Sequence, residues 1–146
     1  MKKLLRSTLW MMTLALVGFQ LSSCEKENTQ QAAASTNIQG LWVGTYSING
    51  QTGLGMQFYA FTIKPDGTMV NESNYTGQQH FSVGPWSLKG DTLTCTYTTV
   101  YGYPQHIGIT EIGTAFFNRT NNTLVGTWRN VPPLAGSGPF ILTKVE

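Results

Sequence analysis

The sequence predicts an all-β fold, an eight-stranded antiparallel up-and-down barrel that covers residues 38–146. Three observations lead to this prediction. No window of this region shows a sustained helical period. β-branched and aromatic residues occur instead in eight short runs, which Gly, Pro, Asn and Asp separate. The connections between the runs are tight turns in alternation with mostly longer loops, as in a meander of antiparallel strands.

Each run has the length of a β-strand and ends at residues that favour a change of chain direction. In order, the strands are expected at residues 40–48, 56–64, 68–75, 79–88, 92–101, 106–117, 123–130 and 139–145. The connections after the second, fourth and sixth strands are the tight turns "PDG" (65–67), "KGD" (89–91) and "TNN" (120–122). The other connections are "NGQTGLG" (49–55), "GQ" (77–78), "GYPQ" (102–105) and "VPPLAGSG" (131–138).

Successive connections of a meander fall at opposite ends, so one end of the barrel collects the tight turns and the other collects the longer loops. The first strand starts at the end with the tight turns. Closure of eight strands removes the exposed sheet edges, and the interior is then filled by side chains or holds one small ligand. A two-sheet sandwich has a similar strand pattern and is the alternative fold.

The N-terminal residues 1–23 have the pattern of a signal peptide. Basic residues come first, and an apolar run over residues 9–19 follows, which is far shorter than the roughly 20 residues that span a bilayer. The next segment, "LSSC", ends at Cys24 and resembles the lipobox of bacterial lipoproteins. The resemblance implies cleavage before Cys24 and attachment of acyl chains such as palmitate to this residue, which would anchor the protein to a membrane. An ordinary secretory peptide is the alternative.

Residues 24–37 are expected to be the lipidated cysteine and a flexible tether, because "EKENTQQAAASTN" is polar and has no periodicity. Glu25 differs from the Asp that retains many lipoproteins at the inner membrane. The start of the segment, "CEKEN", also resembles an acidic export signal for lipoproteins of Gram-negative bacteria. These features imply an outer-membrane location with display on the cell surface.

The charge of the chain argues against nucleic-acid binding. Three of the nine Lys and Arg residues lie in the leader, which has no acidic residue, so the remaining chain carries a formal charge of −1. No basic cluster is left to neutralise phosphates.

Every tryptophan outside the leader lies two residues after a glycine. The pairs are Gly40 and Trp42, Gly84 and Trp86, and Gly126 and Trp128. Residues two apart in a strand share a face, so each glycine lies beside its Trp and is expected to leave a notch for a bulky ring from its own or a neighbouring strand. In a meander, Trp42 and Trp86 fall at the end with the tight turns, and Trp128 falls at the loop end.

The stretch "GLW" at the start of the first strand is similar to the Gly-x-Trp signature of lipocalins and their calycin relatives. The segments "FTIKPDGTM", "GPWSLKGDTLT" and "LVGTWRN…GPFILTKVE" resemble small lipocalin-like lipoproteins of Gram-negative bacteria. In lipocalins the first-strand Trp closes one end of the barrel beneath a basic residue near the C-terminus. The resemblance implies this role for Trp42, with Lys144 as the basic partner and Trp86 nearby.

Strand alternation also predicts an aromatic opening at the loop end. Tyr46 and Trp128 are expected to point inward there, with Tyr97 and Tyr101 on the fifth strand, and His106 lies near the same end. Such an opening suits a small hydrophobic or aromatic ligand. The alternative is that these rings form the core of a solid barrel, which presents loops 49–55 and 131–138 to a protein partner.

The sequence gives little indication of catalysis, a cofactor or a metal site. His80 and His106 have no further ligand at metal-binding spacing, and Cys95 has the surroundings of a buried apolar residue. Glu72 and Glu111 would be an acid–base pair only if the fold brought them together, which nothing in the sequence indicates. The chain is therefore expected to be a binding protein with no enzymatic activity and no cofactor.

Overall fold

The computed structural model describes residues 37–146. The expected signal peptide, the lipidation of Cys24 and most of the tether lie outside the described residues. The described part contains no helix with the length and apolar character needed to cross a membrane.

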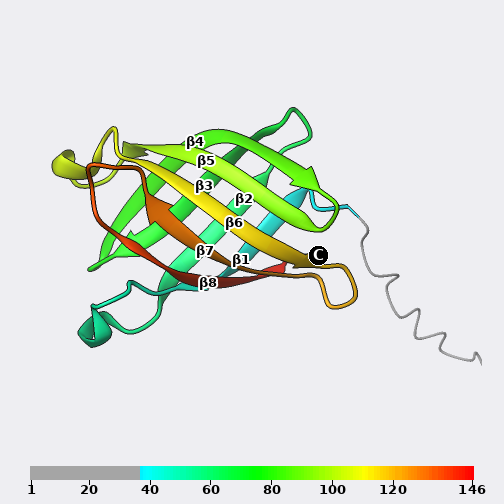
Figure 1. The fold of residues 1–146 in the computed structure, drawn as a ribbon, viewed down its shortest axis with the longest axis horizontal. Helices are drawn as coiled ribbons and strands as arrows, with labels where there is room; N and C mark the ends of the chain where they lie inside the picture. Colours follow the sequence, from blue (N-terminus) through cyan, green and yellow to red (C-terminus); the bar gives the residue numbers. More distant parts are fainter. Residues whose placement is uncertain (1–36) are drawn as a thin grey trace, which may run out of the picture. The chain divides into compact units, whose positions relative to one another are not determined.

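Eight antiparallel strands form a closed barrel in which each strand pairs with its neighbours in sequence and β1 pairs with β8 (Figure 1). The strands are β1 (Gly40–Tyr46), β2 (Gln57–Ile63), β3 (Thr68–Tyr75), β4 (Gln78–Lys89), β5 (Thr92–Tyr101), β6 (Thr110–Asn118), β7 (Thr123–Asn130) and β8 (Ser137–Lys144). The predicted fold class, an up-and-down barrel of eight strands, is confirmed, and the two-sheet sandwich is excluded.

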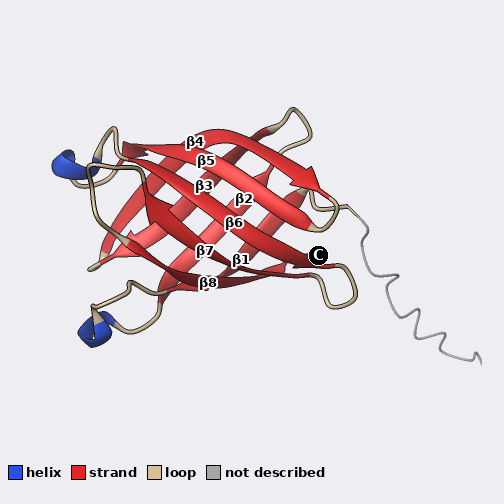
Figure 2. Cartoon of the chain, in the orientation of Figure 1, coloured by secondary structure: helices blue, strands red, loops and turns tan. Residues whose placement is uncertain are grey.

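The two ends of the barrel differ as the sequence predicts. We call the end with the β2–β3, β4–β5 and β6–β7 connections the turn end, and the opposite one the loop end. Two short 3-10 helices, η1 (Thr52–Leu54) and η2 (Pro104–His106), lie in loops at the loop end (Figure 2). The sixth strand begins at Thr110 and not at residue 106, because η2 occupies the segment that begins at Pro104.

The half of the barrel nearer the turn end has a solid apolar core. Its rings and aliphatic side chains point inward from every strand except β4, whose Trp86 and Leu88 pack against it partly buried, and most of the others are fully buried. They include Trp42, Phe61, Ile63, Met69, Leu93, Cys95, Ala115, Phe117, Leu124 and Leu142. Burial of this apolar surface is the main source of stability for the barrel.

The turn end is closed by the predicted aromatic and basic side chains. Trp42 is fully buried and donates its indole N–H to the carbonyl oxygen of Ile38 at 2.7 Å. The ammonium group of Lys144 lies 5.9 Å from the Trp42 ring centroid, so the proposed basic partner is in place. Trp86 lies at the same end and donates its indole N–H to the Lys64 carbonyl oxygen at 2.9 Å.

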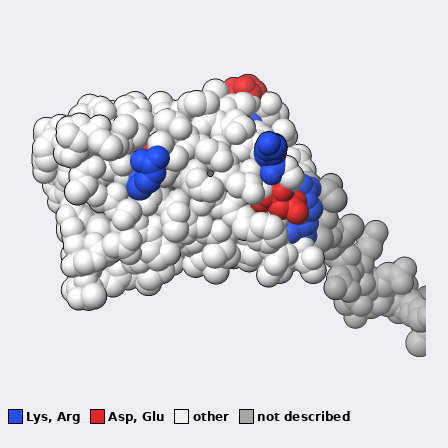
Figure 3. Space-filling view, viewed as in Figure 1, with Lys and Arg blue, Asp and Glu red and all other residues white. Residues whose placement is uncertain are grey.

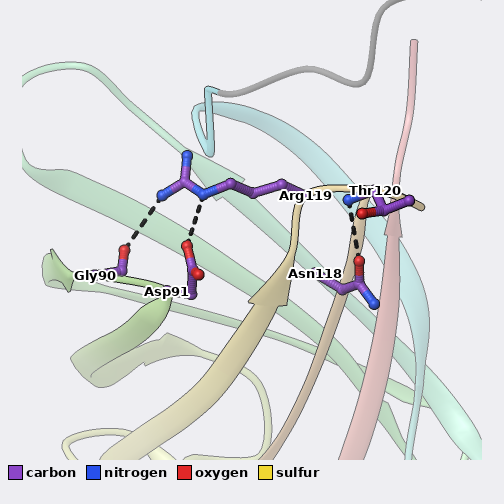
Figure 4. Close-up of polar contacts among 5 residues, drawn as sticks. All are labelled: Gly90, Asp91, Asn118, Arg119 and Thr120. Atoms are coloured by element: carbon purple, nitrogen blue, oxygen red, sulfur yellow. Dashed lines mark hydrogen bonds and ion pairs between the residues drawn. The ribbon is translucent and has the colours of Figure 1, made fainter.

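Arg119 is a second basic residue at the turn end, which the sequence reasoning missed. Its Nε atom lies 2.6 Å from an Asp91 carboxylate oxygen, and its guanidinium also donates to the Gly90 carbonyl oxygen at 3.2 Å (Figure 4). The guanidinium carbon is 5.0 Å from the ring centroid of Phe117, which packs edge-on against Trp42. Arg119 therefore links the β4–β5 and β6–β7 turns above the core. The ion pair itself is half-exposed and contributes little to stability.

The notches beside Trp86 and Trp128 are filled mainly by backbone and not by rings, and the one beside Trp42 faces the Lys144 side chain. A Cβ atom at Gly84 would lie 2.0 Å from the Thr96 carbonyl oxygen, and one at Gly126 would lie 2.2 Å from that of Thr114. The expectation of a pocket for a bulky ring at these glycines is therefore wrong. The glycines are needed because the strands of a small, strongly coiled barrel approach each other closely at these positions.

We expect Gly84→Ala to destabilise the protein by about 2–4 kcal/mol, because the added methyl group forces β4 away from β5. Urea denaturation followed by tryptophan fluorescence measures the change. Gly53→Ala is the control, since an added Cβ at Gly53 meets no atom within 4 Å, and its effect should stay within about 0.5 kcal/mol. Equal stabilities of the two variants would contradict the close-approach interpretation.

Candidate functional site

A cavity of about 180 Å³ occupies the loop half of the barrel. Its walls combine aromatic rings with hydroxyl, imidazole and carboxyl groups. The lining residues are Tyr46, Ile48, Gln51, Tyr59, Ser73, Tyr75, His80, Ser82, Thr99, His106, Ile109, Glu111, Trp128, Asn130, Ala135 and Gly136. The cavity lies at the end where the sequence predicts an aromatic opening.

Tyr59 forms the floor of the cavity, and Tyr97 lies directly beneath it. The hydroxyl oxygens of Tyr59 and Tyr97 are 2.5 Å apart, a short hydrogen bond in a fully buried setting. Burial raises the pKa of both phenols well above the ordinary value, so both hydroxyls keep their protons at neutral pH. The Tyr46 ring lies above this pair, with its centroid 4.9 Å from that of Tyr59.

Glu111 brings a carboxyl group into the cavity from β6. In the sheet it pairs with Tyr97 on β5 and Asn130 on β7, and its side chain lines the cavity. Burial raises its pKa from the ordinary 4.5 to about 7, while a hydrogen bond with the Tyr97 side chain acts in the opposite direction. Glu111 therefore titrates near neutral pH.

His80 and His106 form a hydrogen-bonded pair on the cavity wall. Nε2 of His80 accepts the backbone N–H of Tyr103 at 3.3 Å, and Nδ1 of His80 lies 3.1 Å from the Gln78 carbonyl oxygen. These two contacts require Nδ1 to carry the proton of a neutral His80. Nδ1 of His106, 3.0 Å from Nε2 of His80, then acts as a donor. Burial lowers the pKa of His80, in agreement with the neutral form.

The histidine pair belongs to a cluster of four rings. Tyr75 and Tyr103 pack against His106 with centroid distances of 5.6 Å each, and Tyr103 is 5.5 Å from His80. The Tyr103 hydroxyl lies 3.2 Å from the Thr76 hydroxyl in the β3–β4 connection. The cluster therefore joins η2 to the β3–β4 connection beside the cavity.

Trp128 lies on the wall formed by β7 and β8. Its indole N–H donates to the Ser47 carbonyl oxygen at 3.1 Å, and its ring packs edge-on against Tyr46 at 5.8 Å. The loop after β7 is held nearby, because the Asn130 side-chain amide donates to the Ala135 carbonyl oxygen at 2.9 Å. These contacts fix the ring of Trp128 at the edge of the cavity.

The structure brings three of the five predicted ligand-contacting residues to the cavity surface: Tyr46, His106 and Trp128. Tyr97 points inward as expected, but it is fully buried beneath the floor and contacts Glu111 and Tyr59.

The predicted inward orientation of Tyr101 is wrong. The β4–β5 register shifts so that Phe81 pairs with Tyr101 while Ser82 pairs with Thr99, which leaves Val100 as an extra residue on β5. This β-bulge reverses the alternation beyond Thr99. Tyr101 is therefore on the outer wall, 54% exposed, with its ring 5.7 Å from that of Phe81.

The sequence did not predict that the polar side chains of His80, Ser82 and Glu111 line the cavity together. The alternation of the fourth strand could have placed His80 and Ser82 on the inner face. The contact between His80 and His106 could not be read from the sequence, because it depends on closure of the barrel. Glu72 lies outside the cavity lining and accepts a hydrogen bond from Gln79, so Glu72 and Glu111 do not form an acid–base pair.

Cys95 is buried in the core at 2% exposure, and its thiol donates to the Gly113 carbonyl oxygen at 3.6 Å. Burial raises its pKa to about 12, which favours a neutral packing residue over a reactive thiolate.

Charged side chains are sparse around the loop end. On the face shown in Figure 3, most acidic and basic side chains gather toward the turn end. Across residues 37–146, no three His, Cys, Asp or Glu side chains are close enough together to hold a metal ion. Comparison of the sequence with models of protein families and with curated proteins found no match.

Proposed function

We propose that this protein binds a small hydrophobic or aromatic molecule in the cavity at the loop end of its barrel. The cavity supports the proposal because it is lined by aromatic rings and by a few polar groups that converge on one space. A solid barrel would have argued for the alternative in which the loops alone bind a partner.

The size of the cavity favours a ligand with one ring or a small fused ring system. Its volume is about 180 Å³, whereas a dry cavity of roughly 150 Å³ holds benzene and sites for drug-sized molecules run from roughly 300 Å³ upward. The rings of Tyr46 and Trp128 offer apolar faces, and the hydroxyl of Ser82 and the imidazole of His106 offer polar contacts.

Native mass spectrometry of the protein, purified from the cells that make it, tests the proposal. We expect an additional mass that is released on denaturation. Ser73→Phe should reduce its occupancy about tenfold or more, because Ser73 lines the cavity between Tyr59 and His80 and a phenyl ring would fill the space.

Ser87→Phe is the matched control, since it introduces the same ring on the exposed outer face of β4. It should retain the additional mass. A protein that carries no releasable mass, or a ligand that remains bound in Ser73→Phe, would overturn the proposal.

We further propose that the protein is a lipocalin-like lipoprotein of the outer membrane, displayed on the cell surface and anchored through lipid on Cys24. The leader and the "LSSC" segment support this, and so does the resemblance of the barrel segments to lipocalin-like lipoproteins. β1 begins at the turn end, so an anchor that precedes it would attach there and leave the cavity at the distal end. In the same mass measurement, acyl chains would remain after denaturation and would be absent from Cys24→Ser.

A protein partner for the distal loops is the second candidate function. Each of the three longer connections at the loop end exposes a large apolar side chain, namely Met56, Ile107 and Leu134. Such residues are suited to the centre of a protein interface. A pull-down from native membranes that recovers no protein above background would contradict this function.

A further inference from the structure

We propose that the ligand of this cavity is a small aromatic amine, whose ammonium group pairs with the Glu111 carboxylate among the aromatic rings. The inference rests on the proposed binding function and names its ligand class.

Among residues 37–146, Glu111 is the only acidic residue that lines the cavity, and no lysine or arginine of this part lines it. A carboxylate removed from water is costly unless a partner compensates its charge. The interior of the described barrel provides no permanent cation for this purpose. A ligand that carries a positive charge would therefore gain more binding free energy beside Glu111 than a neutral or negatively charged ligand.

The Tyr97 hydroxyl satisfies the carboxylate only in part. When Glu111 is ionised, its oxygens accept the Tyr97 proton, and the Tyr59 hydroxyl must then donate to Tyr97. This chain of two phenols contributes one donor to a carboxylate that has about four acceptor positions. The remaining positions match the three N–H donors of a primary ammonium group.

His80 on the cavity wall does not replace the missing cation. His80 is neutral because its Nε2 atom accepts the backbone N–H of Tyr103. His106 donates its Nδ1 proton to the same nitrogen of His80, so this proton is not available to the Glu111 carboxylate.

The rings around the cavity favour a cation over an anion. Tyr46, Tyr59, Tyr75 and Trp128 all line it, and the faces of such rings attract a positive charge. The same rings provide apolar contact for the flat part of an aromatic amine. The cavity thus combines one carboxylate with an apolar, electron-rich wall.

Titration of the full-length protein with benzylamine, benzyl alcohol and phenylacetate at pH 8 tests the inference. These probes share one ring and differ in charge. Labelling with ¹⁵N-tryptophan allows the indole N–H signal of Trp128 to report on the cavity, while that of Trp42 at the turn end is the internal control. We expect benzylamine to bind about tenfold or more tightly than benzyl alcohol, and phenylacetate to bind most weakly.

Glu111→Gln should remove the preference for benzylamine over benzyl alcohol, whereas Glu111→Asp should retain part of it. Equal binding of amine and alcohol to the unmodified protein, or tightest binding of phenylacetate, would overturn the amine assignment while leaving the binding function in place. An amine preference that persists in Glu111→Gln would also overturn it. If none of the probes shifts the Trp128 signal and no releasable ligand is found in the native protein, the binding function itself fails.

Discussion

Replacement of Trp42 by alanine is expected to destabilise the protein by about 3–5 kcal/mol, a large share of the roughly 5–15 kcal/mol that stabilises a typical domain. Trp42 has no exposed surface and packs edge-on against Phe117 at 5.5 Å. Its removal leaves a cavity beneath Lys144 and deprives the Ile38 carbonyl oxygen of its donor at 2.7 Å. Urea denaturation followed by far-UV circular dichroism measures the loss without depending on the missing indole.

Trp86→Ala is the matched control for this prediction. Trp86 occurs in the same Gly-x-Trp pattern and at the same end of the barrel, but it is only partly buried against the core. Its substitution should cost about 1–2 kcal/mol, mainly from the lost contact and the hydrogen bond to Lys64. Equal losses of unfolding free energy in Trp42→Ala and Trp86→Ala would show that burial of a side chain at the start of β1 has no special role in closing the barrel.

Glu111→Gln is expected to stabilise the protein at pH 8, by up to about 3 kcal/mol. Burial raises the pKa of Glu111 from 4.5 to about 7 in the folded protein. Below pH 4.5 the carboxyl group is protonated in both the folded and unfolded chains, so it imposes no penalty. As the pH rises from 4.5 to 7, the unfolded chain ionises first and folding loses stability, and above pH 7 the penalty is complete. Glutamine has no charge to bury and escapes this penalty.

His80 produces the opposite pH dependence. Burial lowers the pKa of His80 below 6.5 in the folded protein. Its contribution to stability is therefore present above pH 6.5 and is lost as the pH falls through the lower pKa of the folded protein. The unmodified protein therefore combines two opposing trends between pH 4.5 and 6.5. Glu111 also contributes to the raised pKa values of Tyr46, Tyr59, Tyr97 and Cys95, which keep these groups neutral over this range.

Comparison of the unmodified protein with Glu111→Gln isolates the contribution of Glu111, because the His80 trend is common to both. Urea denaturation at a series of pH values from 4.5 to 8 should show a stability difference that grows with pH and levels off above 7. The variant alone should lose stability toward acidic pH. A difference that stays constant with pH would contradict the raised pKa of Glu111 as its cause.

Much of the fold followed from local sequence features. The alternation of apolar residues and the turn residues at 65–67, 89–91 and 120–122 predicted the strands, their order and the two unlike ends. The same alternation placed Tyr46 and Trp128 on the inner face near the loop end, where they line the cavity. It failed at Tyr101, because the bulge between β4 and β5 depends on how two strands fit together and not on either strand alone.

By itself, the sequence determined the eight strands, their expected order and the two unlike ends, since a period of two and a choice of turn residues are local properties of the chain. The resemblance to lipocalins implied that Trp42 closes the turn end, and the structure decided between a barrel and a two-sheet sandwich. Only the tertiary structure decided the chemistry of the cavity. It joined His80 to His106, separated Glu111 from Glu72, and placed Tyr97 beneath Tyr59 at the cavity floor. The physical reason is that a buried charge and its hydrogen bonds depend on distance and burial across the barrel, which are fixed only when all eight strands have closed.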